Sequence, residues 1–152
     1  MPSTATTQTP QRTYSIKEAS EITGLASSTL RYYEQVGVGP VIGRDESSGH
    51  RVYSEEDVEL LGWIACLAAT GMGIAEMREY VANGKSALRN AAKQVELLRA
   101  HDEALKAEQR LLRQRRKYLA LKMRFWQAVE AGDEALADDL AAQSLAVART
   151  IR

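Results

Sequence analysis

Apolar residues recur in two different ways along this chain, and the change divides it into two parts. Between Tyr14 and about Gly84, short apolar stretches at helical spacing are separated by turns that contain glycine. From about Ser86 to Ala131 there is neither glycine nor proline, and apolar residues alternate at spacings of three and four. The pattern predicts a small globular unit followed by one long helix.

Two short helices joined by a tight glycine turn are predicted at the start of the globular unit. Ser15, followed three residues later by Glu18, has the spacing of a capping box and begins the first helix. Ser27 or Ser28 is expected to cap the second helix, over residues 29–35. Ala19 and Ile22 are expected to lie on one face of the first helix, and Leu30 and Tyr33 of the second are expected to face inward. This arrangement is a helix-turn-helix pattern.

A small hairpin is predicted next, over residues 44–53, with two serines and a glycine at its turn. Ser54 and Asp57 then repeat the capping pattern at the start of a helix that runs to about Ala69. A shorter helix is expected over residues 74–82. Residues 13–84 are therefore predicted to form one domain, in which a helix-turn-helix is followed by a hairpin and two further helices.

The long helix, expected within residues 85–131, carries a continuous apolar seam. Its members are Leu88, Ala91, Val95, Leu98, Leu105, Leu112, Leu119, Met123 and Trp126. Asp102, Gln109 and Arg116 interrupt one of its two core positions. One copy of a helix about 60 Å long cannot bury such a seam, so we expect a homodimer. The spacing is equally compatible with parallel and antiparallel pairing.

Composition narrows the class of protein. Hydrophobic residues make up 45% of the 152 residues and charged residues 26%, which is typical of a folded chain. No apolar run is long enough to cross a membrane, and no signal-peptide pattern is present. The single cysteine, Cys66, fits a reducing compartment. We therefore expect a cytoplasmic protein, with a flexible tail at residues 1–12 and a helical tail at 132–152, where Leu136, Leu140 and Leu145 are candidate packing residues.

Charge is distributed unevenly although the net charge is zero. Residues 11–83 hold 6 Lys or Arg and 11 Asp or Glu, whereas residues 84–126 hold 12 and 4. Attraction to DNA would therefore depend on a few well-placed groups and not on a general positive field. The acidic balance of residues 11–83 favours an alternative, in which the chain is a coiled-coil module that binds another protein.

The second short helix and the hairpin carry the candidate DNA contacts. Hydroxyl groups and free amides at a helix N-terminus can bind phosphate, and arginine can reach a phosphate or a guanine edge. The candidates are Ser27, Ser28, Thr29, Arg31 and Tyr32 on the helix, with Arg44, His50 and Arg51 on the hairpin. Taken alone, these residues also fit an ordinary surface helix and a solvated turn.

A family resemblance rests on an ordered set of motifs that covers nearly half of the chain. The matching residues are Tyr14-Ser15-Ile16, Thr29-Leu30-Arg31-Tyr32-Tyr33-Glu34, Gly37, Gly49-His50-Arg51-Val52-Tyr53-Ser54, Asp57, Gly71-Met72, Ile74 and Met77. They resemble the MerR family of transcription regulators. The resemblance implies a mainly α-helical protein with a winged helix-turn-helix, a long antiparallel dimerisation helix, and Tyr14, Tyr33 and Tyr53 as further residues of the DNA site.

The resemblance also implies a mechanism and partners. Members of this family bind a promoter dyad as homodimers and distort an overlong spacer, so that RNA polymerase recognises both of its promoter elements. The stretch from Cys66 to Met72 is similar to the thiol- and aldehyde-responsive NmlR/AdhR branch, which makes Cys66 a candidate sensor. A small buried filler is the other interpretation of this thiol.

Other activities have weaker sequence support. A metal sensor needs several ligands together, but Cys66 is the only thiol, and His50 and His101 are far apart in the predicted plan. Phe125 and Trp126 could line a site for a non-covalent ligand, although Trp126 at seam spacing also fits a dimer contact. No catalytic constellation, phosphate loop or cofactor motif is present, so the sequence predicts no enzyme and no cofactor.

Overall fold

The computed structural model of the chain describes residues 12–151, so residues 1–11 of the expected tail lie outside the described residues. The chain divides into two compact units, Met1–Leu97 and Leu98–Arg152, and each is described by itself. The division falls within the long helix. Among the described residues, no helix is both long enough and apolar enough to span a membrane.

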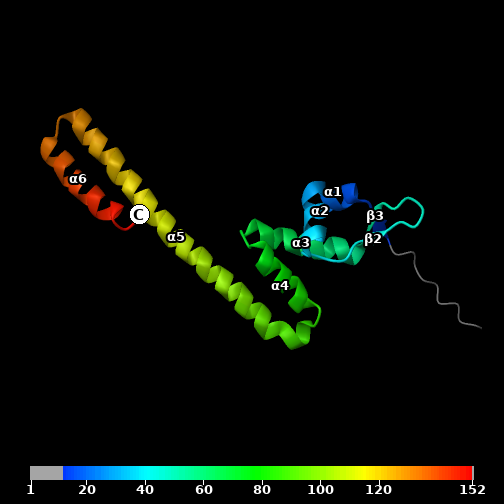
Figure 1. Ribbon diagram of the computed structural model, residues 1–152. Coiled ribbons are helices and arrows are strands. Elements are labelled where there is room, and N and C mark those ends of the chain that lie inside the picture. Colours follow the sequence, from blue (N-terminus) through cyan, green and yellow to red (C-terminus); the bar gives the residue numbers. More distant parts are fainter. Residues whose placement is uncertain (1–11, 152) are drawn as a thin grey trace, which may run out of the picture. The chain divides into compact units, whose positions relative to one another are not determined.

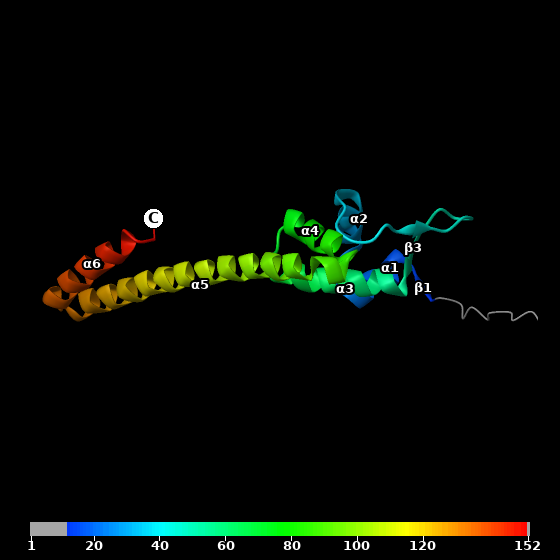
Figure 2. The same ribbon diagram turned by 90° about the horizontal axis from the view of Figure 1, so that it is seen from below.

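The first unit is mainly helical, with a small sheet (Figure 1). Its elements are β1 (Thr13–Tyr14), α1 (Ile16–Thr23), α2 (Ser27–Val36), β2 (Gly43–Arg44), β3 (Arg51–Ser54), α3 (Glu55–Ala69), α4 (Ile74–Gly84) and the start of α5 (Ala87–Ala131). The predicted hairpin is the antiparallel pair of β2 and β3, which projects beside α1 in both ribbon views (Figure 2). This is the winged helix-turn-helix that the sequence predicts.

The third strand of the sheet was not predicted. β1 pairs antiparallel with β3, and Thr13 lies opposite Ser54 while Tyr14 lies opposite Tyr53. The strand order is therefore β1-β3-β2, with the hairpin strand β3 in the centre. A strand of two residues carries too little alternation to be recognised by its pattern alone.

Side-chain caps mark the starts of α1 and α3, and both of these predicted caps are confirmed. The Ser15 hydroxyl accepts from the Glu18 amide at 3.3 Å, and the Glu18 carboxylate accepts from the Ser15 amide at 2.7 Å. Ser54 and Asp57 repeat this exchange at the start of α3. The predicted cap by Ser27 or Ser28 is wrong, because α2 begins at Ser27, two residues before the predicted start, and its N-cap is Ala26.

The core of the first unit lies where α1, α2, α3, α4 and the sheet meet. Its fully buried side chains include Ala19, Leu30, Val38, Tyr53 and Ile64. Leu30 and Tyr33 face inward as expected. Of the two apolar residues of α1, Ala19 is fully buried, whereas 57% of the surface of Ile22 is exposed. On α3, Leu61 and Ile64 are buried in this core, and Leu60, Leu67 and Ala68 are partly buried against it.

Polar side chains fix the turn between α4 and α5 within the first unit. Gln94 on α5 donates to the carbonyl of Tyr80 at 2.9 Å and accepts from the Asn83 amide at 3.1 Å. The Asn90 side chain donates to the Asn83 carbonyl at 3.1 Å. These bonds satisfy carbonyl groups at the end of α4 and hold the start of α5 against it.

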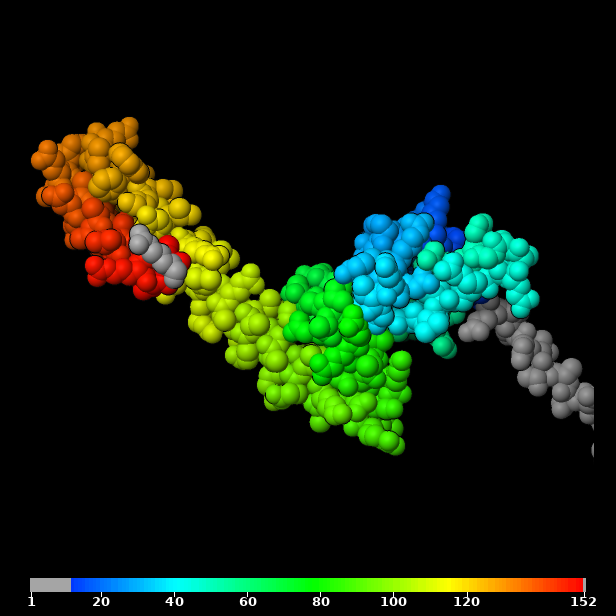
Figure 3. All heavy atoms as spheres, in the orientation of Figure 1, coloured from blue at the N-terminus to red at the C-terminus, as the bar shows by residue number. Residues whose placement is uncertain are grey.

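The second unit is a helical hairpin, in which α6 (Glu134–Ala148) runs back along α5 (Figure 3). Gly132 adopts a left-handed φ of 74° at the turn, and Asp133 caps α6 by accepting from the Leu136 amide at 3.0 Å. Leu121, Ala128, Ala137 and Leu140 form the buried contact. The expectation that Leu136 and Leu145 pack is wrong, because they are 40% and 56% exposed and only Leu140 of the three points inward.

Candidate nucleic-acid interface

The second helix of the helix-turn-helix, α2, presents one polar face and one buried face. Leu30 and Tyr33 anchor it in the core. Ser28, Arg31 and Tyr32 are exposed, and the predicted contacts Ser27 and Thr29 are half-buried. Since 100° separates successive residues of a helix, the buried pair forces Ser28, Arg31 and Tyr32 outward together.

The N-terminus of α2 differs from those of the neighbouring helices. A serine hydroxyl satisfies a first-turn amide in α1 and in α3, and in α4 the Glu76 carboxylate accepts from the Gly73 amide at 2.9 Å. No side chain caps α2, whose N-cap is Ala26. The first-turn amides of α2 are thus available to an external acceptor, and the positive end of the helix dipole favours an anion such as phosphate.

The tip of the wing is ordered by one carboxylate. Asp45 accepts from the Ser47 hydroxyl at 2.6 Å, the Ser48 amide at 2.7 Å and the Ser48 hydroxyl at 2.8 Å. These bonds, the Ser47 hydroxyl foremost, hold the pKa of Asp45 well below its ordinary value, so the carboxylate stays ionised. Gly49 closes the turn with a left-handed φ of 70°, and His50 is exposed beside it.

Glu34 joins the wing to α2, a contact that sequence reasoning missed. One carboxylate oxygen of Glu34 accepts from Arg44 at 3.4 Å, and the other pairs with Nε of Arg51. The Arg51 side chain is one quarter exposed and Arg44 one half. Both arginines therefore fix the wing beside the exposed face of α2, and each has guanidinium nitrogens that Glu34 does not use.

Three of the tyrosines expected in the DNA site are buried in the single chain. Tyr14, Tyr33 and Tyr53 lie in the core. Tyr53 is only 1% exposed, and its hydroxyl has no hydrogen-bond partner within the described residues. Burial raises the pKa of Tyr53 above its ordinary value. These rings position α2 and the sheet, and their side chains do not form part of the exposed face.

The end of α2 is held by α4. Nε of Arg78 donates to the carbonyl of Val36 at 2.9 Å, across 42 positions of sequence. The cation lies at the negative end of the α2 dipole and satisfies one of its last carbonyl groups. A glycine pair that ends α2 was visible in the sequence, but no local pattern pointed to Arg78.

The acidic excess of the first unit lies mainly outside α2 and the wing. Glu55, Glu56, Asp57 and Glu59 belong to α3, and Glu76 and Glu79 belong to α4. Between Ser27 and Ser54, Arg31, Arg44 and Arg51 balance Glu34, Asp45 and Glu46. The exposed face of α2 is therefore locally close to neutral, and Arg31 has no salt bridge to a carboxylate within the described residues.

The candidate sensor Cys66 lies on α3 and is exposed, so the described chain does not use it as a buried filler. Trp63, one turn away, is also exposed. Among the described residues, no group of three or more His, Cys, Asp or Glu side chains is placed to hold a metal ion.

A helix-turn-helix with a wing fixed beside its second helix defines a nucleic-acid-binding protein, and comparisons with known proteins give its family. Residues 14–84 match the MerR HTH family regulatory protein model. The HTH-type transcriptional regulator YyaN of Bacillus subtilis (strain 168) is 35% identical over 111 residues, which cover 65% of this chain and 80% of that protein.

Two further similarities point in the same direction. AdhR, an HTH-type transcriptional regulator of the same organism, is 40% identical over 65 residues, which span 43% of this chain and 46% of AdhR. The crystal structure of HiNmlR, a MerR family regulator lacking the sensor domain and bound to promoter DNA, superposes with a TM-score of 0.60 at 27% identity. It covers 79% of this chain and 94% of HiNmlR.

The chain belongs to the MerR family. It is a MerR-type DNA-binding transcriptional regulator, a class of protein that acts by binding and not as an enzyme.

Proposed function

We propose that the chain regulates transcription by binding a promoter dyad as a homodimer, with α2 in the major groove and the wing beside it. The uncapped N-terminus of α2 supports this proposal most directly, because it offers free amides to a phosphate close to the exposed Arg31. Ser28 and Tyr32 supply hydroxyl donors on the same face. Arg44, His50 and Arg51 reach the adjacent backbone from the wing.

The dimer would form through the seam of α5. Leu88, Leu112 and Leu119 are 102%, 54% and 59% exposed in the single chain. Val95, Leu98, Leu105, Met123 and Trp126 are exposed as well. An apolar stripe of this length is strongly unfavourable in water, and a second copy of the same stripe covers it with matched spacing.

The polar residues of the seam favour antiparallel pairing. In a parallel dimer Asp102 would face Asp102 of the partner subunit, and Arg116 would face Arg116 of the partner subunit, so like charges would meet in the core. In an antiparallel dimer centred near Ala107, every seam position finds a partner: Leu88 faces Trp126 of the partner subunit, and Leu98 faces the partner's Arg116. Asp102 then faces Leu112 of the partner subunit and lies one layer from that arginine, so like charges no longer face each other and the nearer charge has the opposite sign.

An antiparallel dimer would fix the separation of two α2 helices on one face of the DNA. A change at the junction of the first unit with α5 would alter that separation, and the DNA between the half-sites would bend or untwist. RNA polymerase would then recognise a promoter whose spacer is otherwise too long. This part of the proposal follows the family mechanism.

Cys66 is the proposed trigger. Its thiolate can add to the carbonyl carbon of an aldehyde: an S–C bond forms, the C=O π bond opens, and the new alkoxide takes up a proton from water. The added group on the exposed face of α3 would shift the balance between two packings of the dimer. The similarity to AdhR, which is 40% identical over 65 residues, supports this choice of branch.

Gel-shift and DNase I footprinting with the chain's own promoter test the proposal. We expect a protected region with dyad symmetry and half-sites about one helical turn, or a multiple of it, apart. Cys66→Ser should bind the same DNA but fail to respond to an aldehyde in transcription in vitro, whereas wild type responds. A chain that protects no promoter sequence, or a serine variant with the full response, would contradict the corresponding part.

A further inference from the structure

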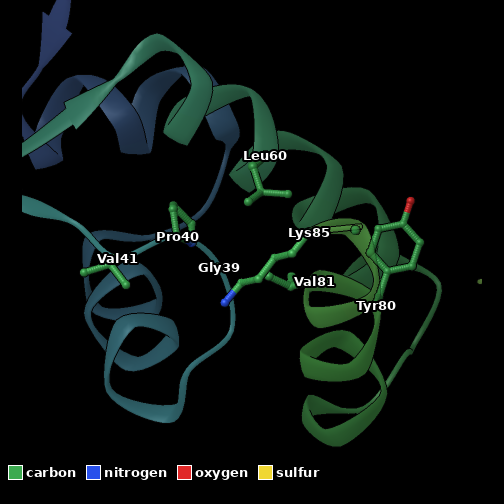
Figure 4. Close-up of a pocket in the computed structure, with 8 residues that line it drawn as sticks. Gly39, Pro40, Val41, Leu60, Tyr80, Val81 and Lys85 are labelled. Atoms are coloured by element: carbon green, nitrogen blue, oxygen red, sulfur yellow. The ribbon is translucent and has the colours of Figure 1, made fainter. Parts of the chain in front are cut away.

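A largely apolar cavity of about 390 Å³ opens in the first unit, among the loop after α2, the middle of α3 and the end of α4. Figure 4 shows Leu60 from α3 and Val81 from α4 directed into a shared space, with Pro40 and Val41 of the loop opposite them. Tyr80 forms its outer edge. A volume of roughly 300–1,000 Å³ is typical of sites for small molecules.

Only one charged side chain lines this cavity. Lys85 follows the end of α4, and its aliphatic stem crosses the opening in Figure 4 toward the loop at Gly39. The remaining lining side chains are apolar, apart from Tyr80. A primary ammonium group above an apolar space matches a ligand with one negative charge and a hydrocarbon body. The negative charge pairs with the ammonium group, and the hydrocarbon body contacts the apolar walls.

We propose that this cavity binds a small organic anion with an apolar body, of the class of medium-chain or aromatic carboxylates. The carboxylate pairs with Nζ of Lys85, and the hydrocarbon body contacts Leu60, Val41 and Val81. Val41 lines the cavity and is 96% exposed in the chain by itself, so its side chain is accessible to a ligand that enters.

The walls of the cavity connect to α2, which carries the candidate DNA contacts, and to the start of α5. The loop at Gly39 continues directly from α2, and a methyl group on Gly39 would approach the Leu61 side chain to 3.3 Å, so this loop is packed closely on α3. On the other side, the Tyr80 carbonyl accepts from Gln94 of α5. A ligand that contacts both walls therefore stabilises one arrangement of α2 relative to the start of α5. This regulatory consequence rests on the proposed function, whereas binding itself does not.

Isothermal titration calorimetry of the full chain without DNA tests the site, with sodium octanoate as the probe and octanamide as its uncharged counterpart. We expect saturable binding of octanoate, and affinity roughly tenfold lower for octanamide, which lacks the charge. Lys85→Met should lower octanoate affinity by a similar factor, while Lys85→Arg should retain it. Lys93→Met, an exposed lysine of α5 outside the cavity, should bind like wild type.

Leu60→Trp is an independent test of the site, because the larger ring fills the cavity and should abolish octanoate binding. Circular dichroism and thermal melting check that this variant is folded. Equal affinity for octanoate and octanamide, or unchanged affinity in Lys85→Met, would overturn the proposal. Binding that is absent in wild type but present in Trp126→Ala would also overturn it, because a second copy would then occupy the cavity.

A gel shift run with and without octanoate separates this inference from the proposed function. Octanoate binding with no promoter shift in any condition would leave the ligand site standing and contradict the proposed function. A promoter shift with no octanoate binding would do the reverse.

Discussion

The helices and sheet of the winged domain bury a common apolar core, whereas the seam of α5 leaves its apolar residues exposed. Ile64, Leu61 and Leu30 are at most 3% exposed, but Leu112 and Leu119 remain more than half exposed in the single chain. Both regions have regular apolar spacing in the sequence. The difference shows that periodicity predicts which residues form an apolar face. The number and order of the elements decide whether the same chain buries that face.

The largest expected effect comes from charge in the seam. Leu105→Asp combined with Leu112→Asp should abolish dimerisation, because four apolar side chains per dimer lose burial and about 5 kcal/mol or more of association free energy is lost. Sedimentation velocity over a range of concentrations measures it. The matched control is Ala100→Asp with Ala107→Asp, two exposed positions of the same helix outside the seam, which should leave the dimer intact. A seam variant that sediments as a dimer would refute the comparison.

A core variant should behave differently from a seam variant. Ile64→Ala should lower the free energy of unfolding by about 2–5 kcal/mol through lost burial and the cavity it leaves. Because Ile64 is covered by its own chain, the loss should be the same at low and high protein concentration. Urea denaturation at two concentrations checks this, and a concentration-dependent loss would mean that the core also depends on the partner.

The exposed face of α2 should contribute to DNA affinity through Arg31. We expect Arg31→Ala to weaken promoter binding by about 1–3 kcal/mol, as is typical of a direct arginine contact. Arg51→Ala should also weaken binding, and should lower the salt dependence if its free nitrogens meet phosphate. Arg89→Ala, an exposed arginine of α5, is the control and should bind normally. Normal affinity in both α2 and wing variants would exclude this interface.

Glu34 separates positioning from contact in the same interface. Glu34→Gln keeps the shape of the side chain but loses the charge that holds Arg44 and Arg51. We expect Glu34→Gln to weaken promoter binding by about 1 kcal/mol, because the wing loses its link to α2. This loss should occur even though the variant gains net positive charge. Tighter binding at low salt would instead mean that Glu34 acts mainly by repelling phosphate.

The smallest expected effect on stability is that of Tyr53→Phe. The Tyr53 hydroxyl is buried without a partner in the described chain, so its removal should change the free energy of unfolding by no more than about 1 kcal/mol, in the stabilising direction. The folded pKa of Tyr53 is raised, so its contribution to stability is present below pH 10 and is lost as the pH rises through the folded value. The variant should therefore lose less stability than wild type as the pH rises above 10.

Capping and periodicity made most of the fold predictable from sequence. Ser15 with Glu18 and Ser54 with Asp57 marked helix starts correctly, because a capping box depends only on residues three apart. The pairing of β1 with β3 and the contact of Arg78 with Val36 were not predicted, because each joins residues about 40 positions apart. The sequence placed Arg44 and Arg51 on one hairpin, but their link to Glu34 was missed, because the folded hairpin alone brings these arginines near α2.

The leucines of α6 show another limit of prediction from sequence, because Leu140 is buried whereas Leu136 and Leu145 are exposed. All three fit a packed helix by composition, yet the face of α6 that meets α5 is lined by Ala137, Leu140 and Ser144. Small residues let the two helices approach closely, and the apolar content of an alanine-rich helix does not reveal which face does so.

Site-directed cross-linking tests the antiparallel dimer most directly. In a Cys66→Ser background, one chain carries Leu98→Cys and a second carries Arg116→Cys, and the two are mixed, exchanged and treated with a short bifunctional thiol reagent. The account predicts cross-linked dimers in the mixture and few in either chain alone, because Leu98 faces Arg116 of the partner subunit. Cross-linking of each chain with itself, but not of the mixture, would show parallel pairing and contradict the account.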